Sequence, residues 1–282
     1  MFAVAWVRSI RRARTEARDG TLRPSALELA IGLVVAFLDT LGIGSFATTT
    51  TLFKTFGVVP DENLPGTILV GFSLPAAAQG LIFMTIVNAD ATLLVCVMIA
   101  TVLGGWLGAQ VVTSLPRRPI QVGMGIGLLL AATFMTMSTL GVFPGGGTAV
   151  ALPVSRLAIA SIGAFVFGGL LMIGIGNFAP CLILLTILGL DPHAAFPVIM
   201  GASAVVAMVG SLTFIEKARY TPRAAIALTL AGIPGVLIAA FLVKSLPLLV
   251  LRWAVVGVVT YAAFMMLRSA ARSSRPPEAA VA

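Results

Sequence analysis

Hydrophobic positions fill most of the chain from about residue 25 to residue 267, and the polar interruptions are short. Because a helix needs about 20 apolar residues to cross the hydrocarbon layer of a membrane, each long run predicts a membrane helix. The runs lie at residues 25–57, 64–87, 92–113, 120–140, 157–190, 195–215, 224–243 and 246–267. The pattern therefore predicts an all-α, polytopic helical membrane protein with about eight main transmembrane segments.

Two of these runs, residues 25–57 and 157–190, are too long for one crossing. A helix of more than 30 residues reaches about 50 Å, whereas the hydrocarbon layer is about 30 Å thick. Each run contains a Gly-x-Gly motif, at Gly42–Gly44 and at Gly174–Gly176. Glycine is also typical of closely packed membrane helices, but its occurrence at equivalent places in both runs favours broken or re-entrant helices.

The two long runs begin two copies of one unit. Residues 42–47 (GIGSFA) align with residues 174–179 (GIGNFA) at an offset of 132, and residues 114–116 (SLP) align with residues 245–247 at an offset of 131. Internal repeats are usual in secondary transporters, where the substrate site lies near the midplane at the repeat interface. The predicted domains are a basic N-terminal arm (1–24), transmembrane repeat 1 (25–140), a linker (141–156), transmembrane repeat 2 (157–267) and a C-terminal tail (268–282).

The net charge of +8 comes largely from arginines before the first run and after the last. This placement predicts cytoplasmic termini at an inner membrane and argues against a nucleic-acid partner. If each long run crosses once, the repeats are parallel and Arg117 and Arg118 lie outside. If each turns back as a hairpin, the repeats are inverted and these arginines face the cytoplasm with Lys217, Arg219 and Arg223. The positive-inside rule favours inverted repeats.

A helix break exposes backbone N–H groups and the positive end of a helix dipole, which together suit an anion. The predicted substrate-binding residues therefore cluster at the two breaks. They are Gly44, Ser45, Thr48 and Thr49 in the first repeat, and Gly176, Asn177 and Cys181 in the second.

Two charged residues near the first break are further candidates. Lys54 is predicted to attract anions or, alternatively, to reach the membrane interface. Asp39 is the one carboxylate deep in an apolar run, and it is predicted either to couple transport to protons or to form a structural hydrogen bond.

Two other functions were considered for the same residues, a passive anion channel and an intramembrane enzyme. A passive anion channel would need the same dipoles and hydroxyls as a transporter. An intramembrane enzyme would pair Ser45 with His193, the one histidine, but the repeat register matches His193 with Asp61 in a loop or helix start. We predict no enzyme, no catalytic residue, no cofactor and no metal site. The expected partners are a small anionic substrate and the lipid bilayer, and a homo-oligomer is left open.

Four segments resemble the TauE/SafE family of sulfite exporters and related permeases: LGIGSFA, GIGNFAP, the PGT at residues 65–67 and the FPVIMGAS at residues 196–203. The resemblance covers about residues 27–267. It implies two related halves, each opening with a glycine-rich break, and it adds Thr67 and Ser203 as small polar site positions. Ser45 and Phe46 stand where the family more often has glycine, and Thr48 replaces a proline. The resemblance implies a permease that exports sulfite, a related sulfur oxyanion or an organosulfonate, by alternating access.

Overall fold

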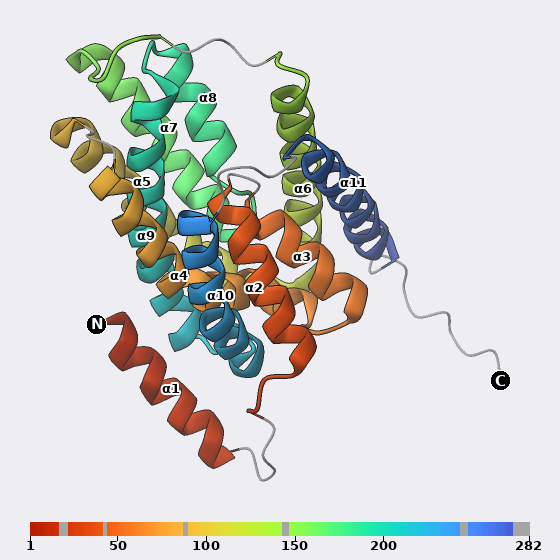
Figure 1. Ribbon diagram of the computed structural model, residues 1–282. Coiled ribbons are helices and arrows are strands. Elements are labelled where there is room, and N and C mark those ends of the chain that lie inside the picture. The colour runs from red at the N-terminus through yellow and green to blue at the C-terminus, as the bar shows by residue number, and fades with distance from the viewer. Residues whose placement is uncertain (17–21, 42–43, 87–89, 143–146, 243–247, 273–282) are drawn as a thin grey trace.

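The computed structural model describes residues 1–16, 22–41, 44–86, 90–142, 147–242 and 248–272. These residues form α-helices and one short 3₁₀ helix, with no strand among them (Figure 1). In chain order the elements are α1 (Phe2–Glu16), α2 (Ala26–Thr40), α3 (Ser45–Phe56), η1 (Asp61–Asn63), α4 (Leu64–Ile86), α5 (Ala91–Ser114), α6 (Arg117–Thr139), α7 (Val154–Met172), α8 (Phe178–Ile187), α9 (Pro192–Glu216), α10 (Pro222–Leu242) and α11 (Leu248–Arg272).

Six helices among the described residues are long and apolar enough to cross a membrane, namely α4, α5, α6, α7, α9 and α10. The predicted all-helical, polytopic class is therefore confirmed. The predicted count of eight segments is not reached within the described residues. The first run is divided between α2 and α3, which are both short, and α11, which contains most of the last run, is not among the six.

Both overlong runs are broken, as the two Gly-x-Gly motifs predicted. The first run is divided between α2 and α3, and the fifth between α7 and α8. Gly44 has φ 85° and Gly174 has φ 102°, in the left-handed region that glycine adopts without a steric penalty. A right-handed helix cannot continue through such a residue, so the chain changes direction there. Gly42 and Ile43, which belong to the first motif, lie outside the described residues.

Helices far apart in sequence pack in pairs. α2 packs against α10, α5 against α7, α4 against α9, and α6 against α11. The α4–α9 pair joins the others, because α4 also contacts α10 and α9 also contacts α5. In Figure 1, α6 and α11 lie side by side at one flank of the bundle.

Glycines set the closest of these contacts. A Cβ atom on Gly104 would lie 1.8 Å from the carbonyl oxygen of Phe165, and one on Gly235 would lie 2.4 Å from the carbonyl oxygen of Leu33. The backbones of α5 and α7, and those of α10 and α2, therefore touch directly. Small residues at helix interfaces are what allow membrane helices to approach this closely.

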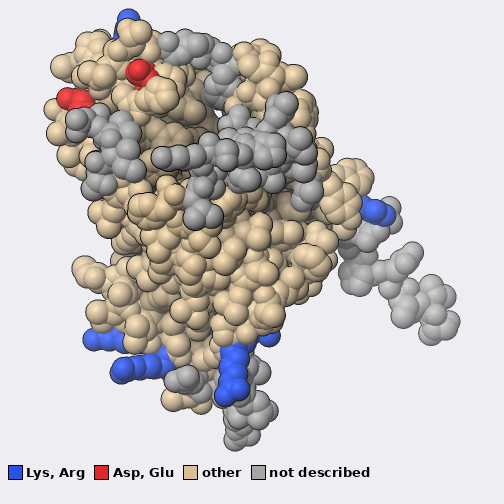
Figure 2. Space-filling view, in the orientation of Figure 1, with Lys and Arg blue, Asp and Glu red and all other residues tan. Residues whose placement is uncertain are grey.

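In Figure 2 most charged side chains lie at the two ends of the bundle, and most of the surface between them is uncharged. At one end, which we call the basic end, Arg223 donates to Glu28 at 3.0 Å and joins the starts of α10 and α2. Arg219 donates to the carbonyl oxygen of Leu115 at 2.7 Å, which brings the turn before α6 to the same end. α1 lies there too, where the Ser9 hydroxyl is 2.6 Å from that of Tyr220.

The opposite end carries aspartates that cap helices. Asp90 and Asp191 accept hydrogen bonds from the first backbone N–H groups of α5 and α9. Thus α4, α6 and α10 begin at the basic end, whereas α5 and α9 begin at the other.

Burial raises the pKa of Tyr220, which lies at the basic end outside the membrane-spanning helices.

Replacing Gly104 with valine should destabilise the protein, because even its Cβ would overlap the carbonyl of Phe165. Overpacking costs about 1–3 kcal/mol, and here the obstacle is backbone that cannot rotate away. We expect a loss near the top of that range, measured as a lower melting temperature of the purified protein in detergent. The control is Gly257→Ala, whose Cβ has no neighbour within 4 Å. Equal melting temperatures for the two variants would contradict the close α5–α7 contact.

Candidate functional site

A cavity of about 260 Å³ lies where the two helix breaks meet. Its wall contains the end of α2 and the start of α3 from the first break, and the end of α7 and the start of α8 from the second. α6 supplies the facing wall. Segments about 130 residues apart in the sequence therefore share one internal space.

At the first break, a carboxylate occupies the start of α3. Asp39, near the end of α2, and Ser45, the first residue of α3, line the same cavity. The N-cap residue Gly44 has no side chain that could cap the helix. Asp39 therefore supplies the negative charge that favours a helix N-terminus.

The threonines of α3 are buried, but their hydroxyls are already used. Thr48 donates to the carbonyl oxygen of Gly44 at 2.9 Å, and Thr49 donates to that of Ser45 at 2.7 Å. Neither residue lines the cavity. The expectation that these hydroxyls donate to an anion is therefore not supported, because each is spent on the backbone of its own helix.

At the second break, Asn177 begins α8 and is almost completely buried. Its amide donates to the Ser203 hydroxyl at 3.1 Å, and that hydroxyl is 3.2 Å from the amide oxygen. Ser203 lies on α9 and lines a second cavity of about 70 Å³. The two cavities share part of their wall, made by Asp39, Ser45, Phe46, Leu171, Asn177 and Phe178.

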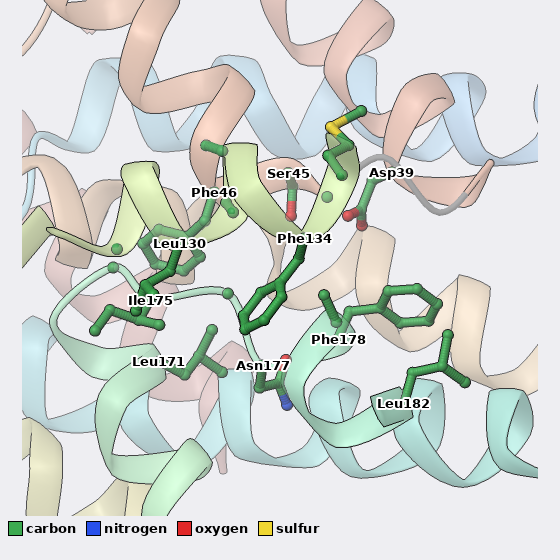
Figure 3. A pocket seen from close by; sticks show the side chains of 18 of the residues that line it. Asp39, Ser45, Phe46, Leu130, Phe134, Leu171, Ile175, Asn177, Phe178 and Leu182 are labelled. Atoms are coloured by element: carbon green, nitrogen blue, oxygen red, sulfur yellow. The ribbon is translucent and has the colours of Figure 1, made fainter. Parts of the chain in front are cut away.

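Apart from these polar groups, the wall of the larger cavity is apolar. Figure 3 shows Asp39, Ser45 and Asn177 on the wall, with the Phe134 ring between Ser45 and Asn177. Asp39 is the one charged side chain among the residues that line the two cavities, and neither lining set contains a lysine or an arginine. Positive potential at this site therefore comes from the backbone N–H groups at the starts of α3 and α8.

The structure brings together only part of the predicted site. Gly44, Ser45, Gly176, Asn177 and Asp39 line the larger cavity, and Ser203 lines the smaller one.

Besides Thr48 and Thr49, three predicted residues lie elsewhere. Thr67 accepts from the backbone N–H of Thr221 at 2.9 Å and ties α4 to α10. Cys181 is buried in an apolar cluster behind the cavity wall. Lys54 points toward the basic end, where its ammonium group is 2.6 Å from Asp61. An anion in the cavity does not reach Lys54, so its predicted attracting role is not supported by its placement.

Residues outside the two motifs also line the two cavities. Phe134 and Ser138 come from α6, about 90 residues after the first motif and about 40 before the second, and no local pattern marks them. Gln79 of α4 is nearly fully buried and donates to the backbone carbonyl of Asp39 at 3.4 Å. A buried glutamine in an apolar run is visible in the sequence, but its partner is not.

A second polar cluster lies at the basic end, where Asp61 is only 3% exposed. Its carboxylate accepts from Lys54 at 2.6 Å, from Arg117 at 2.9 Å and from Gln121 at 2.6 Å. The Ser269 hydroxyl is 3.3 Å from the Lys54 ammonium nitrogen. The cluster thus joins α3, η1, α6 and α11. Among the described residues, no group of three or more His, Cys, Asp or Glu side chains could hold a metal ion.

Comparison with protein families gives one match. Residues 157–282 match the family described as Sulfite exporter TauE/SafE. The resemblance seen in the sequence is therefore confirmed over these residues. The family is one of membrane transporters. No curated protein and no solved structure matches the chain.

Proposed function

We propose that this membrane protein, whose residues 157–282 match the sulfite exporter TauE/SafE family, is a secondary transporter that exports a small anion by alternating access. The best substrate candidate is sulfite or a related sulfur oxyanion or organosulfonate. The observation that carries the proposal is the single internal space between the starts of α3 and α8. Two helix N-termini directed at one cavity make an anion site without a cationic side chain.

The cavity suits an anion that also has an apolar part. A water molecule takes about 30 Å³ in the liquid, so a cavity of about 260 Å³ exceeds the needs of a four-atom ion such as sulfite. Its remaining wall is formed by Phe134, Phe178, Leu182 and other apolar residues. An organosulfonate would place its charged head at Ser45 and Asn177 and its carbon chain along these side chains.

The internal duplication is part of this proposal, and equivalent contacts support it. Gly104 approaches the carbonyl oxygen of Phe165, and Gly235 approaches that of Leu33. The offsets of 131 and 132 found in the sequence relate these two contacts residue by residue. The pair α5–α7 therefore corresponds to the pair α10–α2, with the two repeats exchanged.

Helix direction supports inverted repeats. α6 begins at the basic end with Arg117, whereas its counterpart α11 ends there, because Ser269 contacts Gln121 at 3.2 Å. α4 and its counterpart α9 run in opposite directions in the same way. Hairpins at α2–α3 and α7–α8 give each repeat the odd number of elements that inversion requires. By the positive-inside rule, the basic end faces the cytoplasm, and this places the described starts of α1 and α2 on that side.

Asp39 supports coupling to protons. Two like charges 4 Å apart repel by about 4 kcal/mol at an effective dielectric constant of 20. A helix N-terminus contributes about 0.3–1 kcal/mol, or up to about 2 when partly buried. Repulsion from a charged Asp39 therefore exceeds the attraction of either helix start. An anion therefore binds well only when Asp39 carries a proton. The anion and the proton are then transported together, or one is exchanged for the other.

The alternative functions are less well supported. His193 is exposed at the start of α9 and does not line the cavity that contains Ser45, so the pair needed for hydrolysis is not formed. A passive anion channel would use the same helix starts. It would show an anion current that grows with voltage and does not depend on a pH gradient.

The double variant Ser45→Ala with Asn177→Ala should bind sulfite at least about tenfold more weakly, since hydrogen bonds to a charged group contribute about 1.5–3 kcal/mol. Calorimetry on the purified protein measures this. Thr133→Ala with Thr260→Ala is the matched control, because both residues are exposed and lie outside the cavity wall. If the double variant folds and binds as tightly as the control, the anion site is not at the breaks.

Asp39→Asn mimics the protonated acid, so it should keep anion binding and counterflow exchange and lose the response to a pH gradient. Flux into proteoliposomes is the measurement. Asp90→Asn is the control, because Asp90 caps α5 away from the cavity and asparagine caps a helix equally well. Uphill flux driven at the unsubstituted rate by Asp39→Asn protein would make Asp39 a structural residue.

The orientation is tested by two cysteines in a background of Cys96→Ala and Cys181→Ala. Arg118 is exposed at the basic end, and His193 is exposed at the other. An impermeant thiol reagent added to intact cells should label His193→Cys and leave Arg118→Cys unlabelled. The reverse pattern would place the basic end outside.

A further inference from the structure

Two helix pairs that the repeat relates are packed differently. The offsets match α3 with α8 and α11 with α6. α3 packs along α11, but α8 touches α6 only slightly. The larger cavity separates α8 from α6 instead, with Leu182 on one wall and Phe134 on the other. One of the two equivalent interfaces is therefore closed, and the other is open.

The cavity extends in one direction only. Along α6 its wall runs from Gly127 to Ser138, which is about 16 Å at 1.5 Å per residue. Both this stretch and Phe196 near the start of α9 lie toward the end opposite the basic end. None of the residues that line it comes from the ends of α3, α9 or α11 at the basic end. The smaller cavity reaches Ile68 and Leu69 of α4 on the basic side of the site, but these side chains are only 1% and 2% exposed. The route from the site toward the basic end is therefore closed.

The Asp61 cluster lies across that closed route. Lys54 at the end of α3, Arg117 and Gln121 at the start of α6, and Ser269 near the end of α11 all meet there. These contacts fasten α3 to α6 and α11. Asp61 is buried, so its charge is balanced by these partners and not by water.

Among its described side chains, the second repeat has no such cluster at the open interface. His193, the counterpart of Asp61, is exposed. Thr186, the counterpart of Lys54, donates to the backbone of its own helix. Ser138, the counterpart of Ser269, lines the open cavity instead of contacting a charged residue. The ionic contacts are thus specific to one end of the transport route.

We propose that the Asp61 cluster is the latch of a gate at the basic end, that it is closed in this structure, and that α8 and α6 form the opposite gate, which is open. The inference rests on the proposed transporter function. In the alternate state α3 separates from α11, the contacts of Asp61 with Lys54 break, and α8 closes on α6. In the alternate state, each repeat then has the conformation that the other repeat has in this structure, as inverted repeats permit.

The test measures access to the cavity from each side of the membrane. Ala131→Cys, on the cavity wall, is the reporter in a background of Cys96→Ala and Cys181→Ala, and an impermeant maleimide is added to inside-out or right-side-out vesicles. We expect the reporter to be labelled from the face opposite the basic end. Adding Asp61→Asn should raise the labelling rate from the basic face at least fivefold and lower the rate from the other face.

Asp191→Asn is the matched control, because Asp191 caps α9 at the opposite end and belongs to no such cluster. It should leave both labelling rates unchanged. If Asp61→Asn does not accumulate as folded protein, Lys54→Gln keeps one hydrogen bond, removes one charge of the cluster, and should shift labelling in the same direction.

Unchanged labelling in a folded Asp61→Asn or Lys54→Gln variant would overturn the proposal, as would equal labelling of the parent from both faces. The readout needs no substrate. A failure of sulfite to bind would therefore count against the proposed function, whereas a failure of labelling to shift would count against the gate.

Discussion

The need to satisfy backbone groups inside the hydrocarbon layer determines this structure. A helix that stops at membrane depth leaves N–H and C=O groups without partners, and each costs several kcal/mol unless protein or water meets it. Two helices stop there, α2 at Thr40 and α7 at Met172. Both breaks border one cavity, and Asp39 lies on its wall beside the start of α3. The short helix α3 packs mainly on α11, and α8 packs mainly on α9.

The same constraint creates the site. Once two breaks are buried, their unsatisfied donors face a common space, and that space is attractive to whatever carries negative charge. In this structure Asp39 lies on the cavity wall beside the start of α3, while Asn177 at α8 is held by Ser203. Under the proposed function, a substrate anion competes with this carboxylate. The proposal therefore makes proton uptake by Asp39 a condition of binding.

Much of the fold could be predicted from the sequence, because length and glycine placement are local signals. An apolar run of more than 30 residues cannot cross as one helix, and a Gly-x-Gly motif marks where it breaks. The partners of individual side chains could not be predicted in the same way. The threonines of α3 looked like donors to an anion, but their hydroxyls bond to the preceding turn. Lys54 looked like an anion attractor until Asp61, seven residues on, was found beside it. Phe134 reaches the cavity through tertiary packing alone.

Asymmetry between the repeats carries the functional information that their similarity does not. Two identical halves in an inverted arrangement would have no preference between facing inward and facing outward. Here Asp61 and its cationic partners exist in one half only, so the closed interface at the basic end has ionic contacts that the opposite interface lacks. Burying a charged pair is costly unless its geometry is good, and removing one partner costs more than the pair contributes. Under the proposed gate, the cluster acts less as general stabilisation than as a bias between two conformations of the same helices.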